Sequence, residues 1–166
     1  MIKQAIIPLA GLGTRLLPLT SVMSKELLPI NGKPNLEYIL EECLEAGIKE
    51  FIFIISKNKS SIKKYFFNDV FYKKIIKKKN DKRIIQEFKK IKKYQKMIKF
   101  VYQNNPKGTG DAVLKCKRYI KDKFFLMLLP DDLIVNKNCS KEMISLHKKT
   151  KGSIIATKRV DKKTVS

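Results

Sequence analysis

Apolar residues follow two patterns along the chain: short continuous runs, and stretches in which they recur every three or four positions. The runs predict buried strands, of which residues 51–55 are the clearest example. The helical spacing predicts amphipathic helices, as over residues 35–46, where Pro34 precedes the helix and Gly47 follows it. The predicted strands cover residues 3–9, 51–55, 98–102, 124–129 and 153–157, and the predicted helices cover residues 35–46, 59–67, 82–95, 110–120 and 139–148.

This alternation of strands and helices predicts an α/β fold, with a Rossmann-like, mainly parallel sheet and helices on both faces. We expect residues 1–166 to form a single domain, in which the lysine-rich segment at about residues 57–99 is a helical insertion. In such sheets, ligands bind beyond the carboxyl ends of the strands. The residues that carry chemistry are therefore expected in three segments that follow strands, residues 10–29, 103–111 and 130–133.

The charge of the chain is strongly positive, with 37 lysine and arginine residues against 15 aspartate and glutamate residues and a net charge of +22. A charge of this size suggests a polyanionic partner such as nucleic acid. The distribution of this charge matters more than its total, because residues 57–99 alone contribute +14 and the rest of the chain contributes only +8. Arginine, which is preferred for contacts with phosphates and bases, occurs only four times. A solvated lysine surface is the favoured interpretation, and a nucleic-acid-binding protein is kept as a distant alternative.

The cysteines and the histidine argue against several other classes of site. Cys43, Cys116 and Cys139 are far apart and form no CxxC motif, which argues against a disulfide framework and a cysteine zinc site and favours a cytoplasmic setting. Cys43 and Cys116 lie on apolar helix faces and are expected in the core, whereas His147 is expected to be an ordinary surface residue. No apolar run approaches the roughly 18 residues that span a membrane, so we expect no membrane partner.

The first predicted strand leads into a glycine-containing loop, Gly11-Leu-Gly13-Thr14-Arg15. Glycines let the backbone approach an anion closely, and its free N–H groups can hold phosphate oxygens. Arg15 adds a permanently charged fork that suits phosphate. The loop has Leu16 where a dinucleotide-binding fingerprint has its third glycine, and it lacks the Gly-Lys-Ser/Thr of a Walker A loop. Two glycines alone therefore leave an ordinary turn as an alternative.

A longer sequence motif distinguishes a phosphate-binding loop from an ordinary turn. Residues 11–20 (GLGTRLLPLT), followed by residues 25–29 (KELLP), closely resemble the signature of sugar-phosphate nucleotidylyltransferases. Residues 129–133 (LPDDL) resemble the uridylyl branch, the bacterial UTP–glucose-1-phosphate uridylyltransferases (UDP-glucose pyrophosphorylases). The resemblance implies a nucleotidyltransferase fold, which is glycosyltransferase-A-like, and the reaction UTP + glucose-1-phosphate → UDP-glucose + pyrophosphate. Further matching strings are Lys33-Pro34, Glu37-Tyr38-Ile39, Glu41-Glu42, Ala46-Gly47-Ile48 and the segment from Gln103 to Gly108.

The resemblance also implies roles for individual residues. In the family's reaction the sugar phosphate attacks the α-phosphorus of the triphosphate and pyrophosphate leaves, a step catalysed by alignment and charge neutralisation. Arg15 would act on the β- and γ-phosphates, and Lys25 would offset charge between the two reacting phosphates, so both are the expected catalytic residues. Gln103 would bind the uracil edge, because an amide both donates and accepts hydrogen bonds. The expected nucleotide-binding residues are Ala10, Gly11, Gly13, Thr14, Gln103 and Gly108.

Two aspartates follow the strand predicted at residues 124–129. Asp131 is expected to bind Mg²⁺, a hard cation that bridges phosphates and keeps several waters. Asp132 is the weaker candidate, which would orient the sugar phosphate or support the ligands of the metal. Surface ion pairs are the alternative interpretation of both residues.

Three positions depart from the family pattern. Ser24 stands where the family has proline before Lys25, so the loop that carries this lysine is expected to be less rigid. Thr109 and Asp111 replace an apolar residue and a histidine. Asp111 would place a negative charge near a triphosphate, which is unfavourable unless Mg²⁺ or a lysine neutralises it.

Length is the larger departure, because the resemblance implies that members of the uridylyl branch extend well beyond 166 residues. The remaining part of such proteins carries a sugar-binding glutamate, a lysine for the sugar phosphate and a second metal-ligating aspartate. We therefore expect an amino-terminal portion, completed by its own carboxyl-terminal half or by a second copy, with UTP and glucose-1-phosphate as substrates. The alternatives are a non-catalytic remnant that binds UTP only, or a nucleotidylyltransferase for another sugar phosphate.

Overall fold

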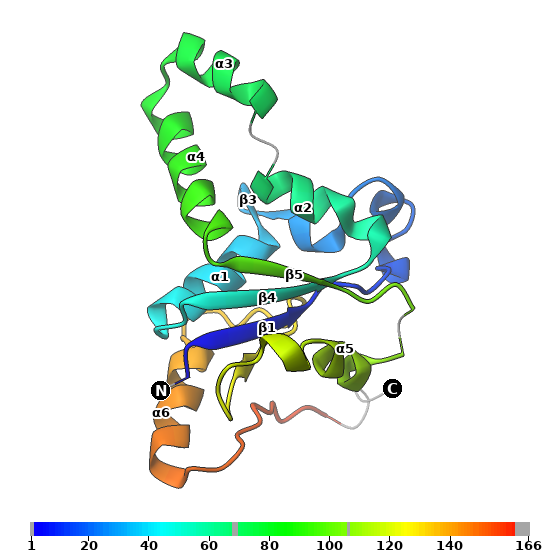
Figure 1. Cartoon of the computed structure of the whole chain (residues 1–166), viewed down its shortest axis with the longest axis vertical. Coiled ribbons are helices and arrows are strands. Elements are labelled where there is room, and N and C mark those ends of the chain that lie inside the picture. Colours follow the sequence, from blue (N-terminus) through cyan, green and yellow to red (C-terminus); the bar gives the residue numbers. More distant parts are fainter. Residues whose placement is uncertain (1, 68–69, 106, 162–166) are drawn as a thin grey trace.

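A computed structural model describes residues 2–67, 70–105 and 107–161. Its centre is a parallel sheet with the strand order β5-β4-β1-β6 (Figure 1). The strands are β1 (Gln4–Pro8), β4 (Glu50–Ile55), β5 (Ile98–Tyr102) and β6 (Leu126–Met127). A separate antiparallel pair is formed by β2 (Pro29–Ile30) and β3 (Lys33–Pro34).

The helices are α1 (Asn35–Glu45), α2 (Ser60–Phe67), α3 (Val70–Lys79), α4 (Lys82–Gln95), α5 (Thr109–Lys115) and α6 (Cys139–Thr150). Short 3₁₀ turns occupy Thr14–Leu16, Leu19–Ser21, Lys25–Leu27, Lys57–Lys59 and Lys117–Tyr119.

Both faces of the sheet are buried, which explains why β1 and β4 consist almost wholly of apolar residues. On one face, side chains of β1 and β4 such as Ile7 and Phe53 join those of α1, α2, α4 and α6 in the larger core cluster. On the other face, Ile6 and Ile52 pack with Ala112 of α5 in a smaller cluster. The predicted α/β class, with a Rossmann-like parallel sheet covered on both faces, is confirmed.

The register of the sheet brings the carboxyl ends of the strands to one edge. Residues of β1 from Gln4 to Pro8 pair with residues 50–54 of β4, which places the ends of the two strands side by side. The chain beyond each end is held by the neighbouring strand: the Leu9 amide donates to the Ile54 carbonyl at 2.7 Å, and the Gln103 amide donates to the Ile55 carbonyl at 2.9 Å. The segments that follow β1, β5 and β6 therefore start from fixed points on this edge.

The predicted elements differ from the structure in four places. The strand predicted at residues 124–129 is reduced to the two residues of β6, which pairs only with β1 among the described strands. The strand predicted at residues 153–157 is wrong: this segment pairs with no described strand, and Ile155 is 83% exposed. An apolar pattern predicts a strand only where a neighbour supplies hydrogen bonds. Helix α3 and the β2–β3 pair were not predicted, because α3 lacks clear amphipathic spacing and the strands have two residues each.

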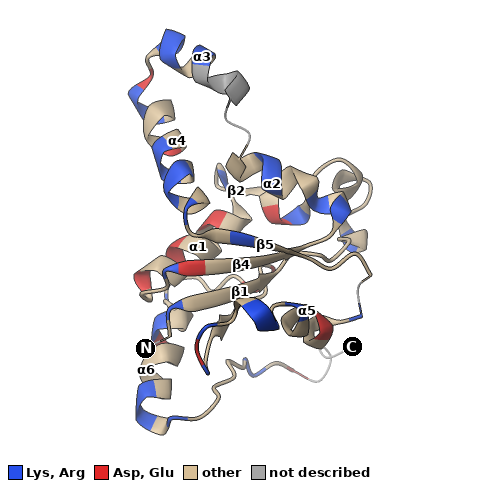
Figure 2. Ribbon diagram, viewed as in Figure 1, with Lys and Arg blue, Asp and Glu red and all other residues tan. Residues whose placement is uncertain are grey.

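The lysine-rich block forms an arm, and α3 and the first turns of α4 project away from the sheet (Figures 1 and 2). The far end of α4 is anchored: Ile91 and Tyr94 are buried, and the Lys90 ammonium lies 2.8 Å from a Glu37 carboxylate oxygen and 2.7 Å from one of Glu41. Most described lysines of the arm are exposed, as expected for a solvated surface; they include Lys74, Lys77, Lys78, Lys79, Lys82, Lys89 and Lys93.

The core position predicted for Cys43 and Cys116 is confirmed. Both are buried free thiols, and burial raises their pKa, to about 11 for Cys116. Thiols with such pKa values are protonated at neutral pH and poor nucleophiles. In the part of the chain that the structure describes, every helix is too short or too polar to cross a membrane.

One buried ion pair fixes the segment between the glycine loop and β2. The Lys59 ammonium, in the 3₁₀ turn before α2, lies 2.8 Å from a Glu26 carboxylate oxygen, and the two side chains are only 6% and 1% exposed. Two charges removed from water in this way depend on each other, because either one alone would be buried without compensation.

We therefore predict that Lys59→Met lowers the free energy of unfolding by about 3–5 kcal/mol, since it leaves the Glu26 carboxylate buried and unpaired. Urea denaturation followed by circular dichroism measures the change. The double variant Glu26→Leu/Lys59→Met should recover most of the loss. Lys57→Met, at an exposed position of the same turn, should change stability by less than about 0.5 kcal/mol. A Lys59→Met variant as stable as the unmodified chain would contradict the prediction.

Candidate functional site

A cavity of about 400 Å³ lies where the segments after β1 and β6 meet. This volume lies within the range of small-molecule sites, about 300–1,000 Å³. The cavity is lined by Gly13, Thr14, Arg15, Leu16, Lys25 and Asp131. Five of these six were expected at a nucleotide site, and the structure brings them together from positions up to 118 residues apart in the chain.

A hydrogen bond between Gly13 and Thr20 closes the turn that follows the first glycine of the loop. Gly13 has a φ of +69°, in the left-handed region that favours glycine, and a Cβ there would lie 3.1 Å from Cγ2 of Thr20. The Thr20 hydroxyl donates to the Gly13 carbonyl at 2.8 Å. This turn leaves Thr14 and Arg15 exposed at the cavity, where the guanidinium is available to a ligand.

Lys25 and Asp131 form an ion pair in this cavity. The Lys25 ammonium donates to a carboxylate oxygen of Asp131 at 2.9 Å. This hydrogen bond is the main cause that lowers the pKa of Asp131, and the charges of Lys25 and Arg15 add to it, so the carboxylate is ionised at neutral pH. Asp131 is about half exposed, so the pair contributes little to stability; its consequence is to hold a cation and an anion in defined positions.

The two neighbours of Lys25 are buried and bonded to the start of α2. The hydroxyls of Ser24 and Ser61 hydrogen-bond at 2.6 Å, and Glu26 forms the buried ion pair with Lys59. The Ser24 hydroxyl, which stands where the family has a proline ring, thus makes a buried hydrogen bond that attaches this loop to α2. Lys59 and Ser61 had no signal in the sequence, since these contacts join residues more than 30 positions apart.

A second cluster lies at the end of β5. Gln103 is buried, and its side-chain nitrogen donates to a carboxylate oxygen of Asp111 at 2.6 Å and to the Gly108 carbonyl at 3.3 Å. Gly108 has a φ of +91°, which suits glycine at the residue before α5. Asp111, noted only as a departure from the family pattern, is therefore a direct partner of the expected base-binding residue. Lys115, whose ammonium lies 3.8 Å from Asp111, partly offsets its charge.

The oxygen atoms that the cavity offers determine whether it suits Mg²⁺. Asp131 offers one ionised carboxylate beside Arg15 and Lys25. Among the described residues, no group of three or more His, Cys, Asp or Glu side chains could hold a metal ion. One carboxylate suits Mg²⁺ that arrives with phosphates and keeps its waters, rather than a cation held by protein alone. Asp132 lines a different groove, with Met127 and Ile154.

The remaining expected residues lie near these clusters without lining the cavity. Ala10 is buried and Gly11 is exposed, and both lie in the loop between β1 and Gly13. The backbone of this loop thus runs from the sheet to the cavity, as a phosphate-binding turn would.

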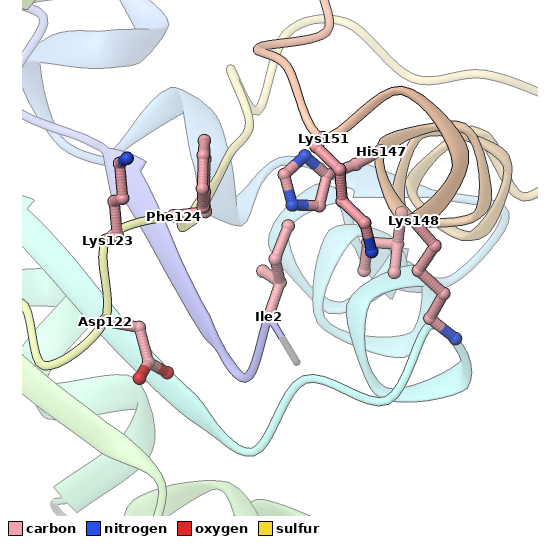
Figure 3. Close-up of a pocket in the computed structure, with 8 residues that line it drawn as sticks. Ile2, Asp122, Lys123, Phe124, His147, Lys148 and Lys151 are labelled. Carbon is pink, nitrogen blue, oxygen red and sulfur yellow. The ribbon is translucent and has the colours of Figure 1, made fainter.

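A second hollow, of about 280 Å³, surrounds His147 (Figure 3). His147 is half-buried rather than an ordinary surface residue: its ring centroid lies 4.4 Å from that of Phe124, and its Nδ1 lies 2.8 Å from the Gly152 carbonyl oxygen. Figure 3 shows Lys148 pointing away from this ring. These contacts give His147 a packing role near the end of α6, in a hollow that shares no lining residue with the larger cavity.

Comparison with known proteins assigns the chain and its fold to a family. The family model described as nucleotidyl transferase matches residues 4–165. UTP–glucose-1-phosphate uridylyltransferase 2 of Staphylococcus saprophyticus is 37% identical over 161 residues, which cover 96% of this chain and 55% of that protein.

Two solved structures have the same fold. UTP-bound UGPase from Acinetobacter baumannii superposes with a TM-score of 0.82 at 32% identity, covering 91% of this chain and 54% of the other. A UDP-glucose pyrophosphorylase complexed with UDP-glucose superposes with a TM-score of 0.73 at 32% identity, covering 91% and 55%. The chain thus spans about half the length of the relatives it matches. With nearly all of its residues within the family model, the chain belongs to the nucleotidyl transferase family.

Proposed function

We propose that this chain carries the UTP-binding part of a UTP–glucose-1-phosphate uridylyltransferase, which converts UTP and glucose-1-phosphate into UDP-glucose and pyrophosphate. The observation that supports this most is the cavity in which Arg15, Lys25 and Asp131 converge beside the glycine loop. The names of the similar proteins support the choice of UTP and glucose-1-phosphate. One is a UTP–glucose-1-phosphate uridylyltransferase, one is a UGPase bound to UTP, and one is a UDP-glucose pyrophosphorylase bound to UDP-glucose.

The reaction joins an oxygen of the sugar phosphate to the α-phosphorus of UTP, while the bond from the α-phosphorus to the leaving pyrophosphate breaks. Positioning and charge neutralisation supply most of the catalysis in such a step. Arg15 binds the β- and γ-phosphates with its fork and stabilises the pyrophosphate as it leaves. Lys25, a compact charge, lies between the reacting phosphates and offsets the charge of the transition state.

Asp131 has two functions in this proposal. It orients the Lys25 ammonium through the 2.9 Å hydrogen bond, and its carboxylate would hold Mg²⁺ that arrives with the phosphates. The bound cation would neutralise charge on the phosphate oxygens. Asp132 lines a different groove, so its proposed function is the indirect one of supporting the sugar phosphate or the ligands of the metal from outside the cavity.

The glycine loop and the end of β5 bind the nucleoside. Backbone amides of residues 10–14 hold the phosphates and approach the base, where Gly11 and Gly13 leave room. Gln103 binds the uracil edge, and Gly108 passes close to the base, where a side chain would collide with it.

We further propose that residues 1–166 form one nucleotidyltransferase domain, in which the lysine-rich helices at about 57–99 are an insertion. A carboxyl-terminal half or a second copy of the chain completes the sugar site. The second candidate function, binding of UTP without turnover, is favoured by the fact that the chain spans only 55% of its relative. Release of pyrophosphate from UTP on addition of glucose-1-phosphate separates the two candidates, and other sugar phosphates in the same assay test sugar specificity.

Isothermal calorimetry with UTP and Mg²⁺ tests the binding proposal. Lys25→Met should weaken UTP binding roughly 10- to 100-fold, because a charge-assisted hydrogen bond worth about 1.5–3 kcal/mol is lost. Lys57→Met, an exposed lysine outside the cavity, should leave the affinity unchanged and thus exclude a general charge effect. No binding by the unmodified chain at millimolar UTP would rule out the proposal.

The ionisation of Asp131 gives a pH prediction. The pKa of Asp131 is lowered in the folded chain, so ionisation of this carboxylate stabilises the folded state. This contribution to the free energy of unfolding is fully present above the ordinary pKa near 3.9. It is lost as the pH falls through the lowered pKa. Carboxyl ¹³C shifts followed by NMR should place the pKa of Asp131 below 3.9 and show it rising in Lys25→Met. An identical titration in both proteins would show that the Lys25–Asp131 pair does not form in solution.

A further inference from the structure

The Gln103 amide is held in one orientation by two acceptors. Its nitrogen lies 2.6 Å from a carboxylate oxygen of Asp111 and 3.3 Å from the Gly108 carbonyl oxygen. Neither oxygen carries a hydrogen, because Asp111 is acceptor-only when ionised and a carbonyl never donates. Turning the amide over would place its own oxygen against two acceptors. The partners therefore assign the orientation, with both hydrogens of the amide occupied.

The amide oxygen is left as the one group that Gln103 can offer to a ligand. Among the described residues, the hydrogen bonds of the Gln103 side chain are the two that its nitrogen donates, and neither involves the oxygen. Gln103 is only 3% exposed, so a ligand that covers this oxygen without donating would leave it buried and unsatisfied. A buried amide in this state accepts a hydrogen bond and gives none.

Asp111 is itself held by the framework. It lies in the first turn of α5, whose Ala112 and Cys116 pack into the core beneath the sheet. The Ala112 amide donates to the Gly108 carbonyl at 3.2 Å, so both acceptors that hold Gln103 belong to the start of this helix. The backbone that carries both acceptors is thus fixed by the position of α5.

We infer that Asp111 is a specificity-determining positioning residue, which turns the Gln103 oxygen toward the base and so selects a pyrimidine that donates from N3. Uracil carries a hydrogen at N3, whereas cytosine presents a lone pair there. The inference rests on the proposed function, because it takes the base to lie against Gln103. Thymine shares the N3 hydrogen, so this device separates uracil from cytosine and not from thymine.

Cytosine has no hydrogen at N3 to donate to the Gln103 oxygen, so its nucleotide should bind more weakly than that of uracil. A site built around a hydrogen bond rejects a ligand that cannot make it, because the buried group of the protein stays unpaired. We expect the unmodified chain to bind UTP roughly 10- to 100-fold more tightly than CTP. A UTP analogue methylated at N3 should lose affinity to the same extent as CTP.

Calorimetry with UTP·Mg²⁺ and CTP·Mg²⁺ on the unmodified chain and on Asp111→Ala tests the inference. The variant frees the amide to turn, so the ratio of the two affinities should fall at least fivefold. Lys115→Ala is the matched control: it removes the cation 3.8 Å from Asp111 on the same helix, and the ratio should stay as it was. The ratio, rather than either affinity, is the readout, because loss of packing would weaken both nucleotides alike.

A donor–acceptor exchange provides the second variant. Gln103→Glu alone places a carboxylate against Asp111 and should reduce UTP binding more than tenfold. Gln103→Glu/Asp111→Asn returns a donor to the Asp111 position, while the Gly108 carbonyl still faces the new carboxylate. The double variant should therefore regain part of the UTP binding and the preference over CTP. If the unmodified chain binds no UTP, the proposed function fails. If it binds UTP and Asp111→Ala keeps the same ratio, or the double variant regains nothing, this inference alone is overturned.

Discussion

The buried ion pair between Glu26 and Lys59 is the interaction on which the geometry of the cavity depends. It joins the 3₁₀ turn that carries Lys25 to the start of α2, and the hydrogen bond between Ser24 and Ser61 holds the residue on the other side of this lysine. Lys25 therefore projects from a segment fixed on both flanks. Because the ion pair is almost fully excluded from water, either member without the other would be unstable, and the attachment behaves as a single unit.

Charge is used differently in the two parts of the molecule. Most described lysines of α3 and of the first turns of α4 are exposed on an arm that projects from the sheet (Figure 2). The cavity, in contrast, contains three charged side chains, Arg15, Lys25 and Asp131, which lie beside the ends of β1 and β6. The net charge of +22 thus says little about the ligand. The positions of two cations and one anion at the carboxyl edge say more, because a nucleotide needs its phosphates neutralised at defined points.

The fold and the cavity were predictable where the signal is local. Apolar runs gave β1, β4 and β5, and the motif around Gly11 and Lys25 placed most of the cavity residues. The strand predicted at residues 153–157 failed because strand formation needs a partner, which sequence pattern does not reveal. The contacts of Ser24 with Ser61 and of Gln103 with Asp111 were equally out of reach, since each depends on how a loop meets a helix. In the sequence, Ser24 and Asp111 stood out only as departures from a family pattern.

Backbone amide shifts of the ¹⁵N-labelled chain, recorded during titration with UTP and Mg²⁺, test most directly whether the cavity at the carboxyl edge is the nucleotide site. Binding at this cavity predicts saturable changes that are largest at Gly11, Gly13, Thr14 and Gln103, with little change along α3 and α4. Changes confined to the lysines of the arm, or no saturable change at millimolar UTP, would contradict it.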